Sequence, residues 1–152
     1  MTTNDIETVE RLIAAPAAKI FDVLADPARH SEIDGSGTVK GVKTPAQRLT
    51  LGATFSMKMK MGIGYTMVNT VVEFEDDKLI AWQPRPDNKV MAMMAGGRIW
   101  RYELESQEGG TLVKESWDIR DEKVPMLVRP MRSKVRKEMT ATLERLAKLV
   151  AE

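Results

Sequence analysis

The stretch that decides the fold is the last one, Val124–Glu152, with the sequence VPMLVRPMRSKVRKEMTATLERLAKLVAE. Its apolar residues recur at steps of three or four, the period of an α-helix. They are Met131, Val135, Met139, Leu143, Leu146 and Val150. Charged residues between them give the helix one apolar and one solvated face. About 20 residues at roughly 1.5 Å each predict a helix near 30 Å long. Pro130 either kinks it or marks where its regular part begins.

The composition predicts one domain over residues 1–152. The chain is 43% hydrophobic and 30% charged, which suits a domain with a sizeable core. A net charge of +1 argues against a dedicated nucleic-acid binder. The longest run without a charged residue, 61–72, has twelve residues, whereas a membrane-spanning helix needs about 20. We therefore expect no nucleic-acid partner and no stable membrane insertion, and either a monomer or a homodimer.

The N-terminus and the lack of cysteine favour a cytoplasmic protein. Residues 1–7 carry acids where a secretory signal has a basic segment followed by an apolar one. Without cysteine there is no disulfide, thiolate nucleophile or Cys-based zinc site. The single histidine, His30, stands near Asp26, Glu32 and Asp34 without a recognised ligand spacing. We therefore expect no metal site and no cofactor.

The chain before the long helix has the pattern of strands, with two short helices near its start. Residues 5–13 predict a strand, Pro16 begins a short helix through Leu24, and a second short helix is expected over 28–33. Further strands are predicted over 38–43, 55–61, 65–75, 79–83, 98–105 and 112–119. This order predicts an α+β fold, in which a curved antiparallel sheet of about seven strands wraps around the C-terminal helix.

The connections between these strands carry turn residues. Gly62-Ile63-Gly64 predicts a flexible turn, Pro84–Asn88 a loop, and Glu108-Gly109-Gly110-Thr111 a hairpin turn. An apolar run, Val90–Ala95, contains Met91, Met93 and Met94 and lies between the Pro-rich loop and a Gly pair. That run is either a lid over a cavity or the end of a strand.

Several segments resemble those of a known family. They are Ile13–Pro27 (IAAPAAKIFDVLADP), His30 with Ile33-Asp34-Gly35, Leu51-Gly52, Gly97–Tyr102, Gly109-Gly110-Thr111 and the terminal helix. Together with the order of elements, they resemble the SRPBCC superfamily, also called START-like or helix-grip, and more narrowly its bacterial polyketide cyclase/dehydrase-type members. The resemblance implies an apolar ligand held between sheet and helix. It is specific for the fold but not for function, because the group includes binding and transfer proteins, cyclases and chaperone activators.

A cavity between the sheet and the helix would be lined by aromatic and methionine side chains from their facing sides. The chain has eleven methionines, whose flexible thioethers either adapt to an irregular apolar ligand or simply fill the core. The residues predicted to line the cavity are Phe55, Met57, Met59, Tyr65, Met67, Asn69, Trp82, Arg98, Trp100, Tyr102, Trp117, Met131, Val135 and Met139.

Two charged residues are predicted on the inner face of the sheet. Arg98 shares strand parity with Trp100, and Glu115 shares it with Trp117. Buried charges are costly unless paired, so these two would meet each other or a polar ligand group. In the functional interpretation, Arg98 holds a ligand carboxylate or enolate oxygen and Glu115 orients it. In the alternative, Arg98 lies at a solvated strand end.

Chemistry in the cavity would have to use a small set of groups: Arg98, Glu115, His30, Tyr65 or Tyr102. For His30 the pattern favours a residue on a helix surface or helix end, near Asp26 and Asp34, over an acid or base.

Three functions fit these observations. The first is a protein that binds a lipid-, polyketide- or aromatic-like small molecule in the cavity. The second is a cyclase, aromatase or dehydratase of polyketide-like substrates, which needs an acid or base inside the cavity. The third is a regulator of a partner protein, resembling the chaperone activators, which predicts a filled interior and an exposed apolar patch.

Overall fold

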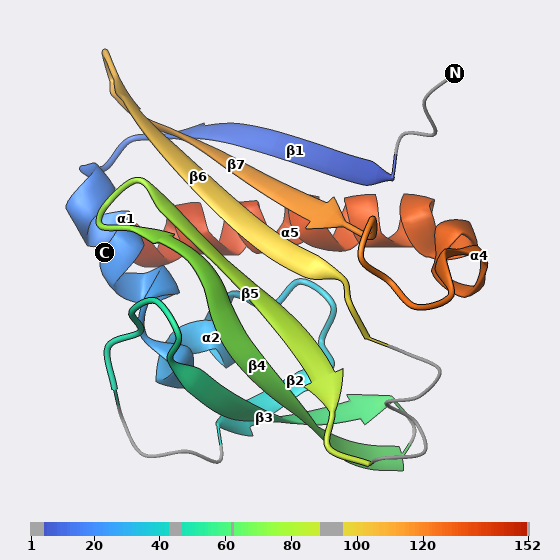
Figure 1. Cartoon of the computed structure of the whole chain (residues 1–152). Helices are drawn as coiled ribbons and strands as arrows, with labels where there is room; N and C mark the ends of the chain where they lie inside the picture. The colour runs from blue at the N-terminus through green and yellow to red at the C-terminus, as the bar shows by residue number, and fades with distance from the viewer. Residues whose placement is uncertain (1–4, 43–46, 62, 89–95, 152) are drawn as a thin grey trace.

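The computed structural model describes residues 5–42, 47–61, 63–88 and 96–151. A seven-stranded antiparallel sheet bends around one long C-terminal helix, with short helices at the two ends of the molecule (Figure 1). This architecture confirms the predicted α+β helix-grip fold.

The strands are consecutive neighbours except for the first. They are β1 (Ile6–Ile13), β2 (Val39–Val42), β3 (Thr54–Met61), β4 (Ile63–Glu75), β5 (Leu79–Pro86), β6 (Ile99–Gln107) and β7 (Gly110–Asp118). Their order in the sheet is β1-β7-β6-β5-β4-β3-β2, and all neighbouring pairs are antiparallel. The last strand, β7, therefore pairs with the first strand, β1.

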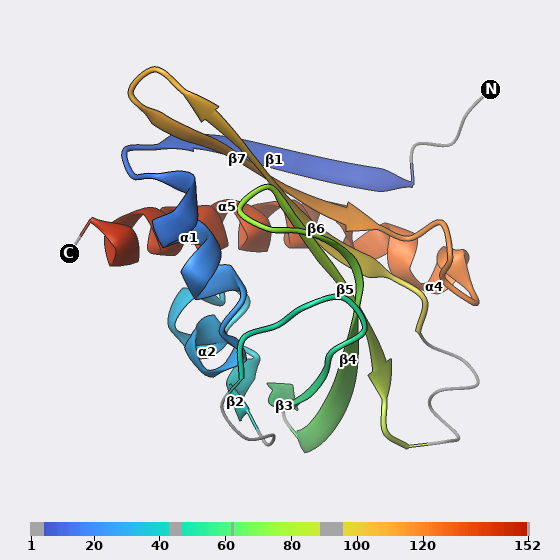
Figure 2. The ribbon, with the colours of Figure 1, turned by 60° about the vertical axis from the view of Figure 1, so that its left-hand side comes forward.

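The helices cover the concave side and the ends of the sheet. They are α1 (Ala17–Leu24), the 3-10 turn η1 (Pro27–Arg29), α2 (His30–Ile33), α4 (Pro125–Val128), the 3-10 turn η2 (Arg129–Met131) and α5 (Arg132–Val150). Figure 2 shows α1 and α2 at one end of the molecule and α4 at the other. Pro130 lies in η2, so it marks where the regular helix begins two residues later. Within the described ranges, no helix combines the length and apolar character needed to cross a bilayer.

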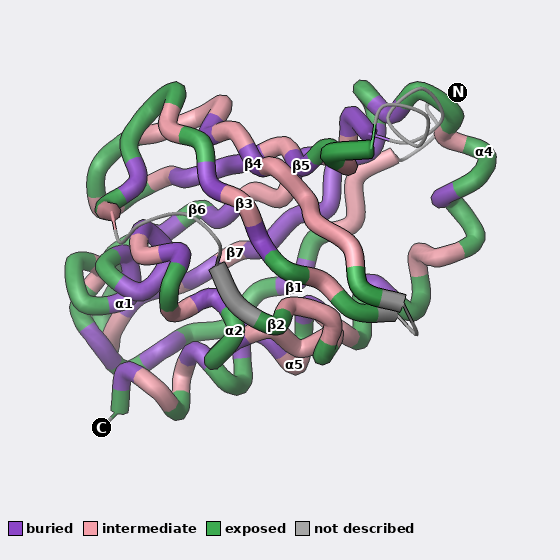
Figure 3. The backbone as a smooth tube through the Cα atoms, turned by 90° about the horizontal axis from the view of Figure 1, so that it is seen from below, coloured by how far each residue is buried: buried purple, intermediate pink, exposed green. Residues whose placement is uncertain are grey.

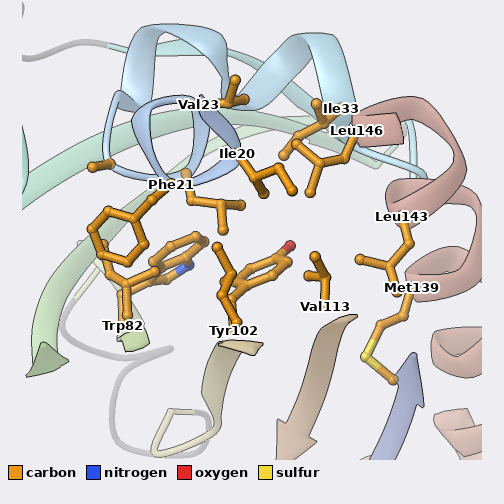
Figure 4. Packing of buried hydrophobic residues seen from close by; sticks show 14 of the residues in the cluster. Ile20, Phe21, Val23, Ile33, Trp82, Tyr102, Val113, Met139, Leu143 and Leu146 are labelled. Atoms are coloured by element: carbon orange, nitrogen blue, oxygen red, sulfur yellow. The ribbon is translucent and has the colours of Figure 1, made fainter. Parts of the chain in front are cut away.

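The apolar stripe of α5 faces the sheet, as its period predicts. Val135, Met139, Leu143, Leu146 and Val150 are all buried. Buried residues recur between exposed ones along this helix (Figure 3). Figure 4 shows Met139, Leu143 and Leu146 facing side chains of α1 and the sheet. The helix is therefore held chiefly by apolar burial on one side.

Ion pairs fix α5 and the turn before it to the edge strand. Glu7 on β1 accepts hydrogen bonds from both Arg132 and Arg136, and Asp5 pairs with Arg129 at 3.0 Å. The Glu7 side chain is only 13% exposed, so water screens these pairs less than it screens surface pairs. The edge strand and the helix are thus joined by polar contacts at one end and by apolar contacts along the rest.

Three predicted boundaries are wrong. Strand β7 begins at Gly110, inside the hairpin turn expected over 108–111. Strand β5 continues through Pro86, where a loop was expected from Pro84, because its pairing with β4 continues to Pro86, although β6 pairs with it only as far as Trp82. Beyond Trp82 one side of β5 has no strand partner among the described residues, so a proline there costs no ladder hydrogen bond on that side. Strand β4 begins at Ile63, inside the predicted turn. The apolar run Val90–Ala95, expected to be either a lid or a strand end, lies outside the described residues.

A glycine allows the turn after α2 to touch α5. The Gly35 amide donates a 2.9 Å hydrogen bond to Thr142 Oγ1 on α5. A Cβ at position 35 would lie 2.2 Å from the Glu138 carbonyl oxygen, so any side chain would push the turn away from the helix. This contact brings α2 and β2 close to α5.

Candidate functional site

A cavity of about 220 Å³ lies between the concave face of the sheet and α5. Its wall combines residues of α2, β2 to β7, η2 and α5. The structure brings to it these residues named from the sequence: Phe55, Met57, Met59, Tyr65, Met67, Asn69, Trp82, Arg98, Trp100, Tyr102, Met131, Val135 and Met139. Trp117 differs, because it is 1% exposed and packs in the core outside the cavity wall.

Four aromatic rings form one side of this wall. The Trp82 ring lies at their centre, with the His30 ring stacked on it at a centroid distance of 4.8 Å and an interplanar angle of 19°. Phe55 and Tyr102 approach Trp82 at 5.7 and 5.5 Å. Figure 4 shows Trp82 and Tyr102 side by side below α1. Phe55 stands nearly perpendicular to Trp82, at 79°, and Tyr102 is tilted from it by 34°. The four rings therefore form an angled aromatic wall that suits an apolar molecule.

His30 lies at a helix end, as one of the two predicted placements has it, but it is buried and not on a helix surface. It begins α2 but is only 6% exposed, and its Nε2 lies 2.8 Å from the Leu24 carbonyl oxygen. Because a carbonyl can only accept, Nε2 carries the proton. Burial lowers the pKa of His30 to about 4, so the ring is neutral at pH 7. Ile33 could have indicated from the sequence that His30 is buried, because residues three apart lie on the same face of a helix.

Glu115 and Tyr102 form a buried pair in the cavity wall. They are direct cross-strand neighbours on β7 and β6. Tyr102 Oη donates to Glu115 Oε2 at 2.9 Å, and both residues are less than 5% exposed. The other carboxyl oxygen, Oε1, is buried and has no hydrogen-bond partner among the described residues. The cavity wall thus contains a carboxyl group with one oxygen, Oε1, that has no hydrogen-bond partner among the described residues.

Burial determines the charge state of this pair. Burial raises the pKa of Glu115 to about 8, the Tyr102 hydrogen bond opposes that rise, and the negative charge of Asp34 adds to it. Burial, followed by the charge of Glu115, raises the pKa of Tyr102 well above its usual value of 10. At pH 7, Glu115 is therefore a neutral carboxylic acid and Tyr102 a neutral phenol.

Arg98 forms an ion pair with Glu122, whereas the sequence pattern suggested an ion pair with Glu115 or contact with a polar ligand group. Its Nε lies 3.4 Å from Glu122 Oε2, and its side chain is 22% exposed where it lines the cavity. The Glu122 side chain is 1% exposed and also accepts 2.9 Å hydrogen bonds from the backbone amides of Gly96 and Arg98. Glu122 therefore fixes the approach to β6, and nothing in its sequence context distinguished it from a solvated acid.

Gly97 explains why this approach is so close. Its φ is +111°, a conformation that favours glycine, and a Cβ there would lie 1.9 Å from the Asp121 carbonyl oxygen. The segment entering β6 therefore packs directly on the segment that leads to α4, and Arg98 is held beside Glu122 by the backbone as well as by charge.

The remaining polar groups of the wall are mostly engaged with the protein. Lys134 and Glu138 pair on α5 at 3.4 Å, and Asp34 accepts the amides of Ser36 and Val39. Tyr65 on β4 is half-buried, and burial raises its pKa. In the described ranges, no group of three or more His, Asp or Glu side chains is arranged to hold a metal ion. The arrangement can enclose an apolar body and offer it very few free polar contacts.

Comparisons with known proteins agree with this architecture. The family model described as polyketide cyclase/dehydrase and lipid transport matches residues 7–151. The uncharacterised protein Rv0088 of Mycobacterium tuberculosis is 40% identical over 109 residues, which is 70% of this chain and 44% of that protein. This chain therefore spans less than half the length of that relative.

Solved structures share the fold at low sequence identity. Protein CV1439 of Chromobacterium violaceum has a TM-score of 0.75 and 14% identity, over 99% of both chains. Protein MLL2253 of Mesorhizobium loti has a TM-score of 0.71 and 16% identity, over 96% of both chains. With the family model matching almost from end to end, the chain belongs to the polyketide cyclase/dehydrase and lipid-transport family, within the SRPBCC superfamily.

Proposed function

We propose that this protein binds an apolar small molecule, of lipid-, polyketide- or aromatic-like shape, in the cavity between the sheet and α5. The observation that carries the proposal is the cavity itself, with about 220 Å³ enclosed by aromatic and methionine side chains. An apolar cavity of about 150 Å³ is already large enough to hold benzene. Natural interiors are close-packed, so an unfilled space of this size needs an explanation, and an apolar guest supplies one.

The charge states of the wall support an uncharged guest. Glu115 and His30 both border the cavity, and burial holds both in their neutral forms at pH 7. The ionic groups of the wall, including Arg98 and Lys134, have partners within the protein. A ligand that brings an unpaired charge among these side chains would lose its hydration without gaining a free counter-ion. The cavity therefore favours neutral molecules.

A neutral fluorescent probe, N-phenyl-1-naphthylamine, tests the proposal. The wild-type protein should bind it saturably, with one molecule per chain. The Val135→Trp variant, which places a large ring in the cavity wall on α5, should bind it at least tenfold more weakly. Circular dichroism establishes that the variant remains folded.

A surface variant controls for probe that adheres outside the cavity. Met126 on α4 is 75% exposed, and the Met126→Ser variant removes an apolar surface side chain without touching the cavity wall. Its affinity should equal that of the wild type. Equal affinity for the wild type and Val135→Trp, or loss of binding in Met126→Ser alone, would contradict the proposal.

A second candidate function is a cyclase or dehydratase acting on a carbonyl-rich substrate. Glu115 favours it, because a carboxylic acid with a pKa of about 8 inside an apolar cavity has the properties of a general acid. In this case Glu115→Gln should abolish turnover of a cyclisable polyketide mimic while leaving its binding intact. Unchanged turnover would remove Glu115 from the reaction.

The third interpretation, a regulator of a partner protein, predicted a filled interior. The cavity does not match that expectation, although Met126 and Leu127 on α4 are exposed apolar side chains, as an apolar patch requires. Ligand binding therefore remains the better-supported function.

A further inference from the structure

We propose that the pair Glu115–Tyr102 selects ligands, by donating a hydrogen bond from Glu115 Oε1 to an uncharged carbonyl oxygen on an otherwise apolar molecule. The inference rests on the proposed function, because it concerns the ligand of the same cavity. It adds the chemical class that the cavity accepts and the atom that recognises it.

Glu115 has one oxygen without a hydrogen bond. The residue lines the cavity and is 3% exposed, and its Oε1 has no hydrogen-bond partner among the described residues. Leaving a buried polar group unsatisfied is unfavourable, because the group has lost its hydrogen bonds to water. The wall around it offers aromatic rings and thioethers, which are poor partners for a carboxyl group. A ligand that brings a polar atom to this oxygen therefore binds more tightly than one of the same shape without it.

The hydrogen bond to Tyr102 also places the proton of the neutral Glu115. Tyr102 Oη donates to Oε2, so Oε2 acts as the acceptor within the pair. The carbonyl oxygen of a neutral carboxyl group is a stronger acceptor than its hydroxyl oxygen, so Oε2 is the carbonyl oxygen and the proton is on Oε1. Because burial raises the pKa of Glu115 to about 8, this neutral form predominates at pH 7. The free atom is consequently a donor, and a carbonyl oxygen is its natural partner.

The charges around the pair favour an uncharged ligand oxygen. On β1, the residue paired with Glu115 is Val9, which is apolar. The titratable side chains that share the cavity wall with the pair are His30, Asp34, Tyr65, Arg98, Lys134 and Glu138. His30 is neutral, Arg98 and Lys134 have acidic partners, and the charge of Asp34 acts on Glu115 with a negative sign. A carboxylate or phosphate placed at Oε1 would meet that negative field, so an uncharged oxygen is preferred.

Two probes of nearly equal size test this inference. The compounds 2-acetonaphthone and 2-isopropylnaphthalene have the same number of non-hydrogen atoms and differ by a carbonyl oxygen in place of a methyl group. For each protein, the dissociation constant of the hydrocarbon is divided by that of the ketone. The difference in hydration between the two free probes is the same for every variant, so changes in this ratio report the protein alone.

The variants separate hydrogen bonding from shape. In Glu115→Leu the ratio should fall about tenfold, because the donor is gone. In Glu115→Gln it should stay within about twofold of the wild type, because the amide oxygen can accept from Tyr102 while the amide nitrogen donates to the ketone. Met126→Ser, a surface change on α4 outside the cavity wall, should leave the ratio unchanged.

The pH dependence gives an independent readout. Above pH 8 the wild-type carboxyl group loses the proton it donates, so the ratio should fall between pH 7 and 9.5, while that of Glu115→Gln stays flat. Equal ratios for the wild type and Glu115→Leu would overturn the inference while leaving the proposed function intact. Failure of both probes to bind the wild type would instead contradict the proposed function, and the inference with it.

Discussion

Glu115 and His30 are opposite kinds of titratable residue that burial treats in the same way. An acid buried in apolar surroundings keeps its proton, and a buried histidine remains without its second one. The pKa of Glu115 rises to about 8 and that of His30 falls to about 4. Both side chains border the cavity, so its inner wall holds two ionisable groups and no charge from either at pH 7.

Glu115 should make the protein less stable as the pH rises. Its pKa in the folded protein exceeds the ordinary value of 4.5, so the folded state holds the proton more tightly. This contribution is complete below about pH 4.5 and is lost as the pH rises through 8. Relative to the wild type, Glu115→Gln should gain up to about 1.4 kcal/mol of unfolding free energy per pH unit between pH 5 and 8. Urea unfolding at four pH values measures this, and parallel curves would contradict it.

His30 should act in the opposite direction at lower pH. Its folded pKa of about 4 lies below the ordinary 6.5, so between these values the unfolded chain binds the extra proton first. The wild type should therefore lose up to about 1.4 kcal/mol of unfolding free energy per pH unit as the pH falls from 6.5 to 4. His30→Phe removes the titrating group and should lose less over this range. A variant with the same pH slope as the wild type would refute the assignment.

The hydrogen bond between Tyr102 and Glu115 could not be predicted from the sequence, although the face of the sheet on which each lies could. Strand parity correctly put both side chains on the inner face. Their contact, however, depends on register, which the turn between β6 and β7 sets. The strands already pair at Gln107 and Gly110. A turn with its ends at Glu108 and Thr111, as expected from the sequence, would instead have paired Tyr102 with Trp117.

At the scale of elements, the close contact between the α2–β2 turn and α5 depends on Gly35. Gly35→Ala should destabilise the protein by about 1–3 kcal/mol, because its Cβ would meet backbone atoms of α5, which cannot rotate away. Gly64→Ala on β4 is the matched control, since its nearest neighbour would lie 3.8 Å away, an ordinary contact distance. Thermal unfolding compares the two variants. Equal melting temperatures would show that the turn does not need to approach the helix.

Elements with a strong period were predictable, and their joints were not. The stripe of α5 and the alternation in β3 and β6 follow from local sequence, because each buries one face against the same core. The ion pair of Arg98 with Glu122 depends on how the segment between β7 and α4 packs against Gly97. No local sequence pattern encodes that contact. The extension of β5 through Pro86 likewise depends on its pairing with β4, which continues as far as the pair of Met67 and Pro86.

Across the whole molecule, the sheet and α5 surround a cavity that their own side chains do not fill. Strand β1 and α5 are joined by Glu7, and the opposite part of the sheet reaches α5 through the turn at Gly35. Between these two attachments the helix spans the concave face, and the cavity lies there. Apolar side chains facing an empty space forgo dispersion contacts, so a bound apolar molecule should stabilise the fold as well as occupy it.

The most direct test is to identify what the protein carries. Native mass spectrometry of freshly purified wild-type protein, followed by denaturation and analysis of the released material, reports any small molecule held in the cavity. We expect one neutral, apolar molecule per chain of the wild type, and none in the Val135→Trp variant. If the protein carries nothing, and saturating 2-acetonaphthone and N-phenyl-1-naphthylamine leave its melting temperature unchanged, the claim that the cavity binds a ligand is wrong.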